Sequence, residues 1–201
     1  MANLALHGFS PSRRKDEGPI TQRVGRVLNN QTTAIFLYDA VVRATTGDYV
    51  VATTTTTAVA SVAMGAMYLN AGTGQMVEGK YLPAATLYSG TIVDPPQASY
   101  IFMVSDPLLT QFVASVADSA IALTDLNLNY AMTLTSGSTT TGLSGHVLTA
   151  TGRAATATIP WRVPEFVLGS VNSDPDLINC HVYCEINAGM DEPALTASLG
   201  A

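Results

Sequence analysis

Short apolar runs separated by turn residues recur along most of the chain. They are rich in Val, Thr and Tyr, and Gly, Pro, Asn or Asp stands between them. Short strands at this spacing are typical of a sandwich or a barrel. The sequence therefore predicts an all-β fold with a β-barrel or β-sandwich body. The expected strands are Ala34–Tyr38, Tyr49–Val51, Val59–Leu69, Tyr100–Val104, Phe112–Val116, Tyr130–Leu134, Thr156–Ile159, Val163–Leu168 and Ile178–Ile186.

Helix signals are few. Ser119–Asn129 is expected to be a loop with one helical turn at most, capped by Thr124 and Asp125. Pro160 and Pro164 flank Trp161–Arg162, and proline removes a donor from a strand ladder. This stretch is therefore predicted to be an edge strand or a broken strand.

The ends of the chain lack the strand pattern. Residues 1–27 carry five Gly or Pro residues and no sustained periodicity, which predicts an extended N-terminal arm without a core of its own. The β-barrel or sandwich domain is then expected over 28–188, and the acidic end, 189–201, is expected to be a tail. Deletion of 1–27 should accordingly leave the body folded.

Charge is scarce and unevenly distributed. Charged residues make up 12% of the 201, about half the usual ~25%, and the formal net charge is −6. The arm sums to +3 and the remainder to −9, which argues against a nucleic-acid partner. A surface with so few charges favours contact with other protein. We hypothesise that the arm docks on an acidic protein surface through its five basic residues, Arg13, Arg14, Lys15, Arg23 and Arg26.

The two cysteines stand in a strand pattern. Cys180 and Cys184 fall on the apolar face of the alternating run Ile178–Ile186. Their Cα atoms would lie about 13 Å apart in a strand, beyond disulfide reach. A structural zinc site needs four ligands, and the only other histidines besides His181 are His7 and His146. Two buried, reduced thiols and no metal site are predicted.

No catalytic motif is evident. Gly142–Gly145 is one residue short of the G-x-S-x-G elbow, and the adjacent His146 lies in a Ser-, Thr- and Gly-rich segment, which predicts a flexible hairpin tip. We expect no enzymatic activity and no cofactor. The uncharged segment Val50–Val77 has five consecutive Thr and one Leu, so it is too weakly apolar to span a membrane.

Several segments, taken in chain order, resemble the head decoration (capsid cement) proteins of tailed bacteriophages. The most characteristic is Tyr100–Pro107 followed by Phe112–Ser115, although Ser105 stands where the family has a second acidic residue. The other matching segments are Gly8–Pro11, Thr33–Val42, Val62–Tyr68, Tyr81–Ala84, Ser136–Gly145, Gly169–Asp176 and Cys180–Asn187.

The resemblance implies a non-catalytic β-barrel or β-sandwich protein on the outside of the virion. Such a protein binds the major capsid protein, braces the expanded shell and forms a homo-oligomer, with a trimer favoured and a dimer possible. It would be made in the host bacterial cytoplasm, with neither nucleic acid nor membrane as a partner. Two alternatives stay open. One is another virion component, a tail, fibre or adhesin protein whose Thr139–Thr141 contacts carbohydrate; the other is a wall hydrolase using His146 or His181 with carboxylates.

Overall fold

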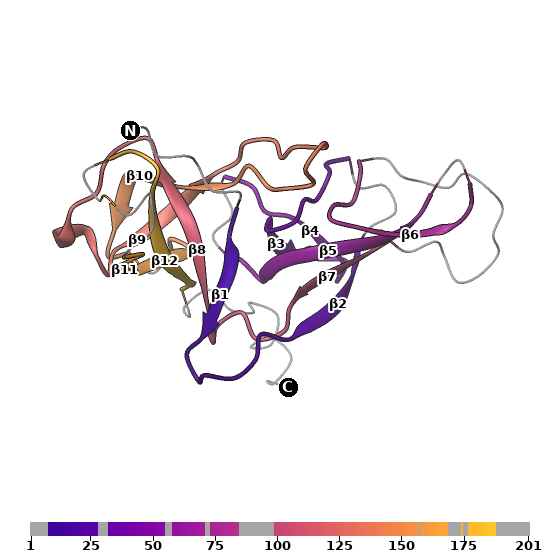
Figure 1. The fold of residues 1–201 in the computed structure, drawn as a ribbon, viewed down its shortest axis with the longest axis horizontal. Coiled ribbons are helices and arrows are strands. Elements are labelled where there is room, and N and C mark those ends of the chain that lie inside the picture. The colour runs from indigo at the N-terminus through magenta and orange to yellow at the C-terminus, as the bar shows by residue number, and fades with distance from the viewer. Residues whose placement is uncertain are drawn as a thin grey trace.

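The fold contains two β-sheets, and each closes on itself through five of its strands (Figure 1). The computed structural model describes residues 8–27, 32–54, 58–70, 73–84, 99–156, 158–168, 174 and 177–187. The predicted all-β barrel body is thus confirmed, in the form of two barrels. The predicted tail, 189–201, lies outside the described residues.

The first barrel is the ring β3-β4-β2-β7-β5, closed by pairing of β3 with β5. The sheet continues from β5 into β6, which pairs along the second half of β5. Its strands are β2 (Gln22–Val27), β3 (Ala40–Arg43), β4 (Tyr49–Val51), β5 (Ser61–Leu69), β6 (Met76–Gly79) and β7 (Ser99–Val104).

The second barrel is the ring β8-β10-β9-β11-β12, closed by pairing of β8 with β12. Two strands pair with the same edge of β8: β1 pairs with its first half, and β10 pairs in parallel with its end. The strands are β1 (Ser10–Arg14), β8 (Thr110–Ala117), β9 (Asn129–Thr133), β10 (Val147–Ala154), β11 (Trp161–Phe166) and β12 (Cys180–Ile186). A short 3₁₀ helix, η1 (Leu123–Asp125), lies in the loop where at most one helical turn is predicted, but Thr124 and Asp125 lie inside it and Ala122 is its N-cap.

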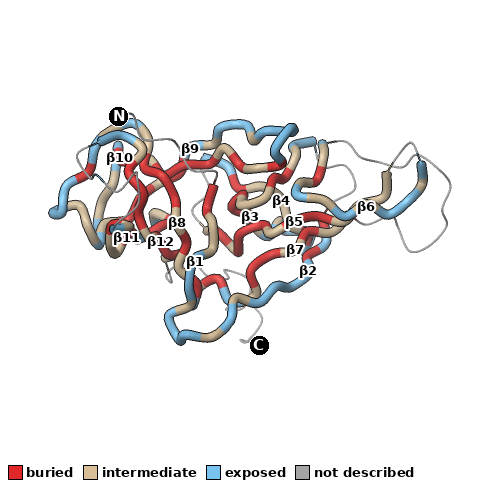
Figure 2. The backbone as a smooth tube through the Cα atoms, viewed as in Figure 1, coloured by how far each residue is buried: buried red, intermediate tan, exposed pale blue. Residues whose placement is uncertain are grey.

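The two barrels share one wall. In β3 and β5, Val41 and Ala63 face the interior of the first barrel, whereas Ala40 and Val62 belong to the core cluster of the second. A strand buried on both faces reads as a continuous apolar run, as these strands do. Figure 2 accordingly shows buried backbone running from one barrel into the other.

Some predicted strands are misplaced. Ala34–Tyr38 is no strand; only Ile35 and Leu37 form single bridges. Thr156–Ile159 falls between β10 and β11. The pattern missed β10, because Gly152 and Arg153 interrupt its apolar alternation. In β11 the register shifts between Arg162 and Glu165, around Pro164, so the broken strand is confirmed, although it lies between β9 and β12.

Residues 8–27 differ from the expected arm. β2 lies between β4 and β7, and β1 pairs with β8. Phe9 is fully buried, and its ring stacks on that of Trp161 with centroids 3.9 Å apart. Gly8 precedes it at φ +71°, where a Cβ would lie 2.4 Å from the Tyr38 carbonyl oxygen. Deletion of 1–27 would therefore open the first barrel and remove a core aromatic, contrary to the expectation from sequence. Residues 1–7 lie outside the described residues.

A long connection between β9 and β10, residues 134–146, reaches from the second barrel over the first (Figure 1). We call it the strap. Leu37 donates its N–H to the Gly142 carbonyl at 3.1 Å, and Ser144 donates to the Leu37 carbonyl at 2.9 Å. At Gly137 a Cβ would lie 2.4 Å from the Phe36 ring. The hairpin tip expected from sequence is present, with a bridge between Ser138 and Leu143, but these contacts hold the strap against the first barrel.

Truncation of Phe9 tests whether the N-terminal segment belongs to the core. F9A should lower the free energy of unfolding by about 3–5 kcal/mol, because a fully buried ring leaves a cavity beside Trp161. F9L should cost less, because it refills much of that space. The control L123A, at a residue 73% exposed, should change stability by no more than about 0.5 kcal/mol. Urea unfolding measures all three, and equal stability of F9A and L123A would contradict the assignment.

Candidate binding surface on the N-terminal basic segment

Arg13 lies in a row of side chains that crosses four strands of the second barrel. Its Nε donates to Gln111 Oε1 at 2.6 Å, and its guanidinium lies 4.6 Å from the centroid of the Tyr183 ring. It also pairs with Glu165 on β11. The positive charge of Arg13 is therefore already matched within the chain.

Lys15 belongs to a second group of charges on the same barrel. Its Nζ lies 2.5 Å from Glu185 Oε2, and Arg162 reaches the other oxygen of that carboxylate at 3.6 Å. The Lys15 N–H also donates to the Leu109 carbonyl at 2.8 Å. These contacts hold the end of β1 against the second barrel.

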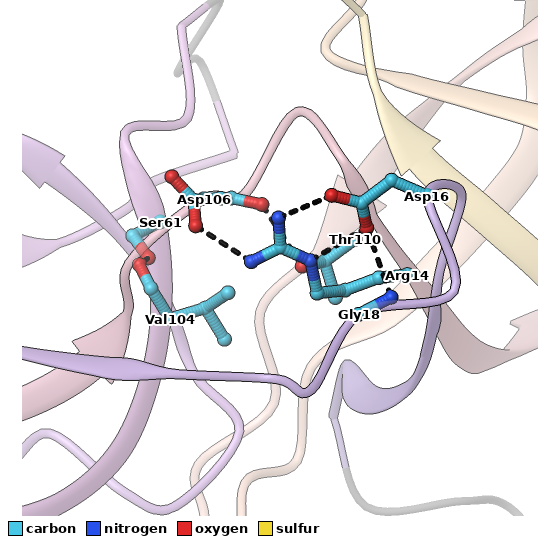
Figure 3. A network of polar contacts seen from close by, with 7 residues as sticks. All are labelled: Arg14, Asp16, Gly18, Ser61, Val104, Asp106 and Thr110. Atoms are coloured by element: carbon cyan, nitrogen blue, oxygen red, sulfur yellow. Dashed lines mark hydrogen bonds and ion pairs between the residues drawn. The ribbon is translucent and has the colours of Figure 1, made fainter.

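Arg14 joins the two connections by which the chain crosses between the barrels, β1–β2 and β7–β8 (Figure 3). We call these connections the crossings. Its guanidinium forms a bidentate pair with Asp16, at 2.8 and 2.6 Å, in the β1–β2 connection. Its third nitrogen donates to Asp106 Oδ2 at 2.7 Å, in the β7–β8 connection. The guanidinium holds the pKa of Asp16 at about 2. Arg14 thus fastens one crossing to the other.

The remaining two cations lie on the first barrel. Arg26 Nε approaches Asp48 Oδ1 at 2.5 Å, and the Asp48 side chain is only 2% exposed. Arg23 lies over the Tyr49 ring at 5.9 Å and has no carboxylate partner among the described residues. The structure therefore separates Arg23 from the other four members of the predicted set.

Arg23 also lines a groove of about 250 Å³ beside the β7–β8 crossing. The walls are Ala60 and the turn that links the barrels, Ser105–Leu109. Pro107 is buried, whereas Leu109 is 42% exposed. The groove thus sets one cation beside apolar side chains.

A buried polar cluster lies where the strap meets β3. His146 Nε2 is 3.4 Å from Asp39 Oδ1, and the two side chains are 5% and 2% exposed. His146 Nδ1 accepts the Ala40 N–H at 3.4 Å, and the His146 N–H donates to Ser144 Oγ at 3.0 Å. Neither imidazole nitrogen is directed to the serine hydroxyl, so this Ser, His and Asp grouping lacks the triad relay. Its contacts secure the strap.

Burial shifts both titratable groups of this cluster. It raises the pKa of Asp39 to about 6, although hydrogen bonds from Ser144 and the Phe36 N–H act in the opposite direction. It lowers the pKa of His146 to about 4. Asp39 is not among the residues predicted from the sequence, where its only signal is a single carboxylate inside the apolar stretch Ala34–Val42.

Other candidate residues are dispersed. Cys180 and Cys184 are buried free thiols, as predicted, and burial raises the pKa of both. His181 lies on β12 and His7 lies outside the described residues. Within the described ranges no three His, Cys, Asp or Glu side chains gather as a metal site would require. Nor does that part of the chain hold a helix long and apolar enough to cross a membrane.

Comparisons of the chain with protein-family models, with curated proteins and with solved structures found no match.

Replacement of Arg14 tests its grip on the two crossings. In R14Q the pKa of Asp16 should rise from about 2 towards 3.8, because the bidentate partner is lost. Carboxyl NMR titration measures this shift. The control R43Q removes an equal charge from β3 and should leave Asp16 at about 2. With Arg14 in place, the Asp16 contribution to stability is complete above pH 3.8 and is lost as the pH falls towards 2.

The Asp39–His146 pair should give two variants with opposite pH dependence. In the folded protein Asp39 binds its proton more tightly than in the unfolded chain. Its contribution to stability therefore falls as the pH rises from 3.8 to 6. His146 binds its proton less tightly, so its contribution rises between pH 4 and 6.5. Relative to wild type, D39N should gain stability with rising pH and H146Q should lose it.

Each change should amount to roughly 3 kcal/mol across its interval, from a shift of about two pKa units. Urea unfolding at a series of pH values measures the curves. Parallel curves for wild type and both variants would show that neither group is perturbed by burial.

Proposed function

We propose that this chain is a capsid decoration protein, which binds the outer surface of the major capsid protein shell and stabilises the expanded head. The observation that carries the proposal is the series of motifs in chain order that resemble such proteins, above all Tyr100–Pro107 with Phe112–Ser115. Those residues form β7, the crossing to β8 and the centre of β8. The all-β barrel fold is the fold class that the resemblance implies.

The surface chemistry supports a role in protein contact. Charged residues are few, and on the second barrel Arg13, Lys15 and Arg162 are matched by Glu165 and Glu185. Charges that are paired within the chain cost less free energy to cover with another protein than unpaired charges do. Such a surface suits broad, repeated contacts in a shell, where several weak contacts together give firm attachment.

We also propose a partner, an oligomeric state and a location for this chain. The partner is the major capsid protein, the chain acts as a homo-oligomer, with a trimer favoured over a dimer, and it resides on the outer capsid surface. It has no catalytic role and needs no cofactor. The hypothesis that all five basic residues dock on the shell stays a prediction. Four of the five already pair with carboxylates of this chain, so docking through them would compete with those pairs.

One feature favours a second candidate, another virion component that contacts host carbohydrate. Thr139–Thr141 form the exposed tip of the strap, and hydrogen bonds between Ser138 and both Gly142 and Leu143 close this tip into a turn. The packing of the strap on the first barrel presents these hydroxyls at a fixed place. A tail, fibre or adhesin protein would use such a tip.

The copy number in purified virions separates the two functions. A decoration protein covers the shell, so its ratio to the major capsid protein should be near one or a simple fraction of one. Quantitative mass spectrometry measures that ratio. A few copies per particle would favour the tail, fibre or adhesin role, and absence from virions would contradict both.

A further inference from the structure

Arg23 is the member of the basic segment that makes no ion pair with the described residues, so it can bind a partner without breaking one of those pairs. Arg13, Arg14, Lys15 and Arg26 each contact a carboxylate. Release of Arg26 would also leave Asp48 buried and unpaired, which is strongly destabilising. The Arg23 guanidinium lies 5.9 Å from the centroid of the Tyr49 ring and has no carboxylate partner among the described residues, so a carboxylate can approach it without breaking such a pair.

The surroundings of Arg23 define the rest of the ligand. Arg23 lines the groove together with Ala60, Leu108 and Leu109. Asp106 also lines it, but Arg14 already binds one oxygen of that carboxylate at 2.7 Å. Figure 3 shows this pair at the crossing, with Ser61 and Val104 beside it. The groove therefore offers one unmatched positive charge and an adjoining apolar surface.

We propose that this groove binds a segment of the shell protein that brings a carboxylate to Arg23 and an apolar side chain onto Leu108 and Leu109. The inference rests on the proposed function and narrows it, because it selects one of five basic residues and one face of the molecule. Arginine and carboxylate make short, charge-assisted hydrogen bonds, and apolar surface beside such a pair excludes water and strengthens it.

A peptide segment fits the groove better than a nucleic acid does. Phosphate recognition relies on several cations along a backbone, whereas this groove has one. The Asp106 carboxylate at its rim and the net charge of −6 repel a polyanion. A single carboxylate can pair with Arg23 alone, and its one negative charge is repelled less by Asp106 and by the net charge than a polyanion is.

Binding of the full-length chain to heads provides the test. The probe is the expanded head of the virus that encodes this chain, purified without the chain, and co-sedimentation over a concentration series gives the affinity. R23Q should weaken binding about tenfold or more, in the range of an interface hot spot. L109D should weaken it similarly, because it removes apolar contact and repels the incoming carboxylate.

The matched control is R43Q. Arg43 lies on β3 of the same barrel, is exposed and donates only to the Gly47 carbonyl, at 3.4 Å, among the contacts described for it. R43Q changes the net charge by the same amount as R23Q and should bind like wild type. Urea unfolding of each variant should match wild type, which shows that a lost affinity reflects the groove and not the fold.

The outcomes distinguish this inference from the proposed function. Wild-type chain that fails to bind heads overturns the decoration function and the groove with it. Wild-type binding with R23Q unchanged overturns the groove alone. Equal weakening by R23Q and R43Q also overturns it, because the effect would then follow net charge and not position.

Discussion

The Phe9–Trp161 stack lies within a core to which both barrels contribute. Phe9 enters from the N-terminal segment, and Trp161 comes from β11 near the far end of the chain. The same cluster includes Val62 and Val104 of the first barrel. These side chains face away from the interior of their own barrel. They are shielded from water only when the second barrel packs against them. The two barrels therefore depend on each other.

Polar contacts hold the segments that connect the two barrels. Arg14 binds Asp16 and Asp106 where the chain passes between the barrels, and His146 of the strap accepts the N–H of Ala40 at the start of β3. The first group is solvated at its edge, whereas the second is buried. Burial penalises charge, so the pKa shifts of Asp39 and His146 have the direction expected for groups removed from water.

Ion pairs within the chain neutralise most of the positive charge of the N-terminal basic segment. Five cations in the first 26 residues suggest a docking arm when they are counted along the sequence. In the folded chain, four of them pair with carboxylates from other parts of the sequence, such as Glu165, Glu185 and Asp48. Among these five cations, Arg23 alone has no carboxylate partner within the described residues, and it lines a groove together with Leu108 and Leu109.

The sequence by itself determined the all-β class, the single helical turn, the broken strand at Pro164 and the two buried thiols, because each depends on local alternation or on the chemistry of one residue type. Only the tertiary structure decided that there are two barrels, that Phe9 lies in the core and that Asp39 meets His146, 107 positions later in the chain. Contacts between distant segments leave no periodicity in a single sequence. The strap depends on both: its glycines predicted a turn, but only the packing against Phe36 explains why Gly137 has no room for a side chain.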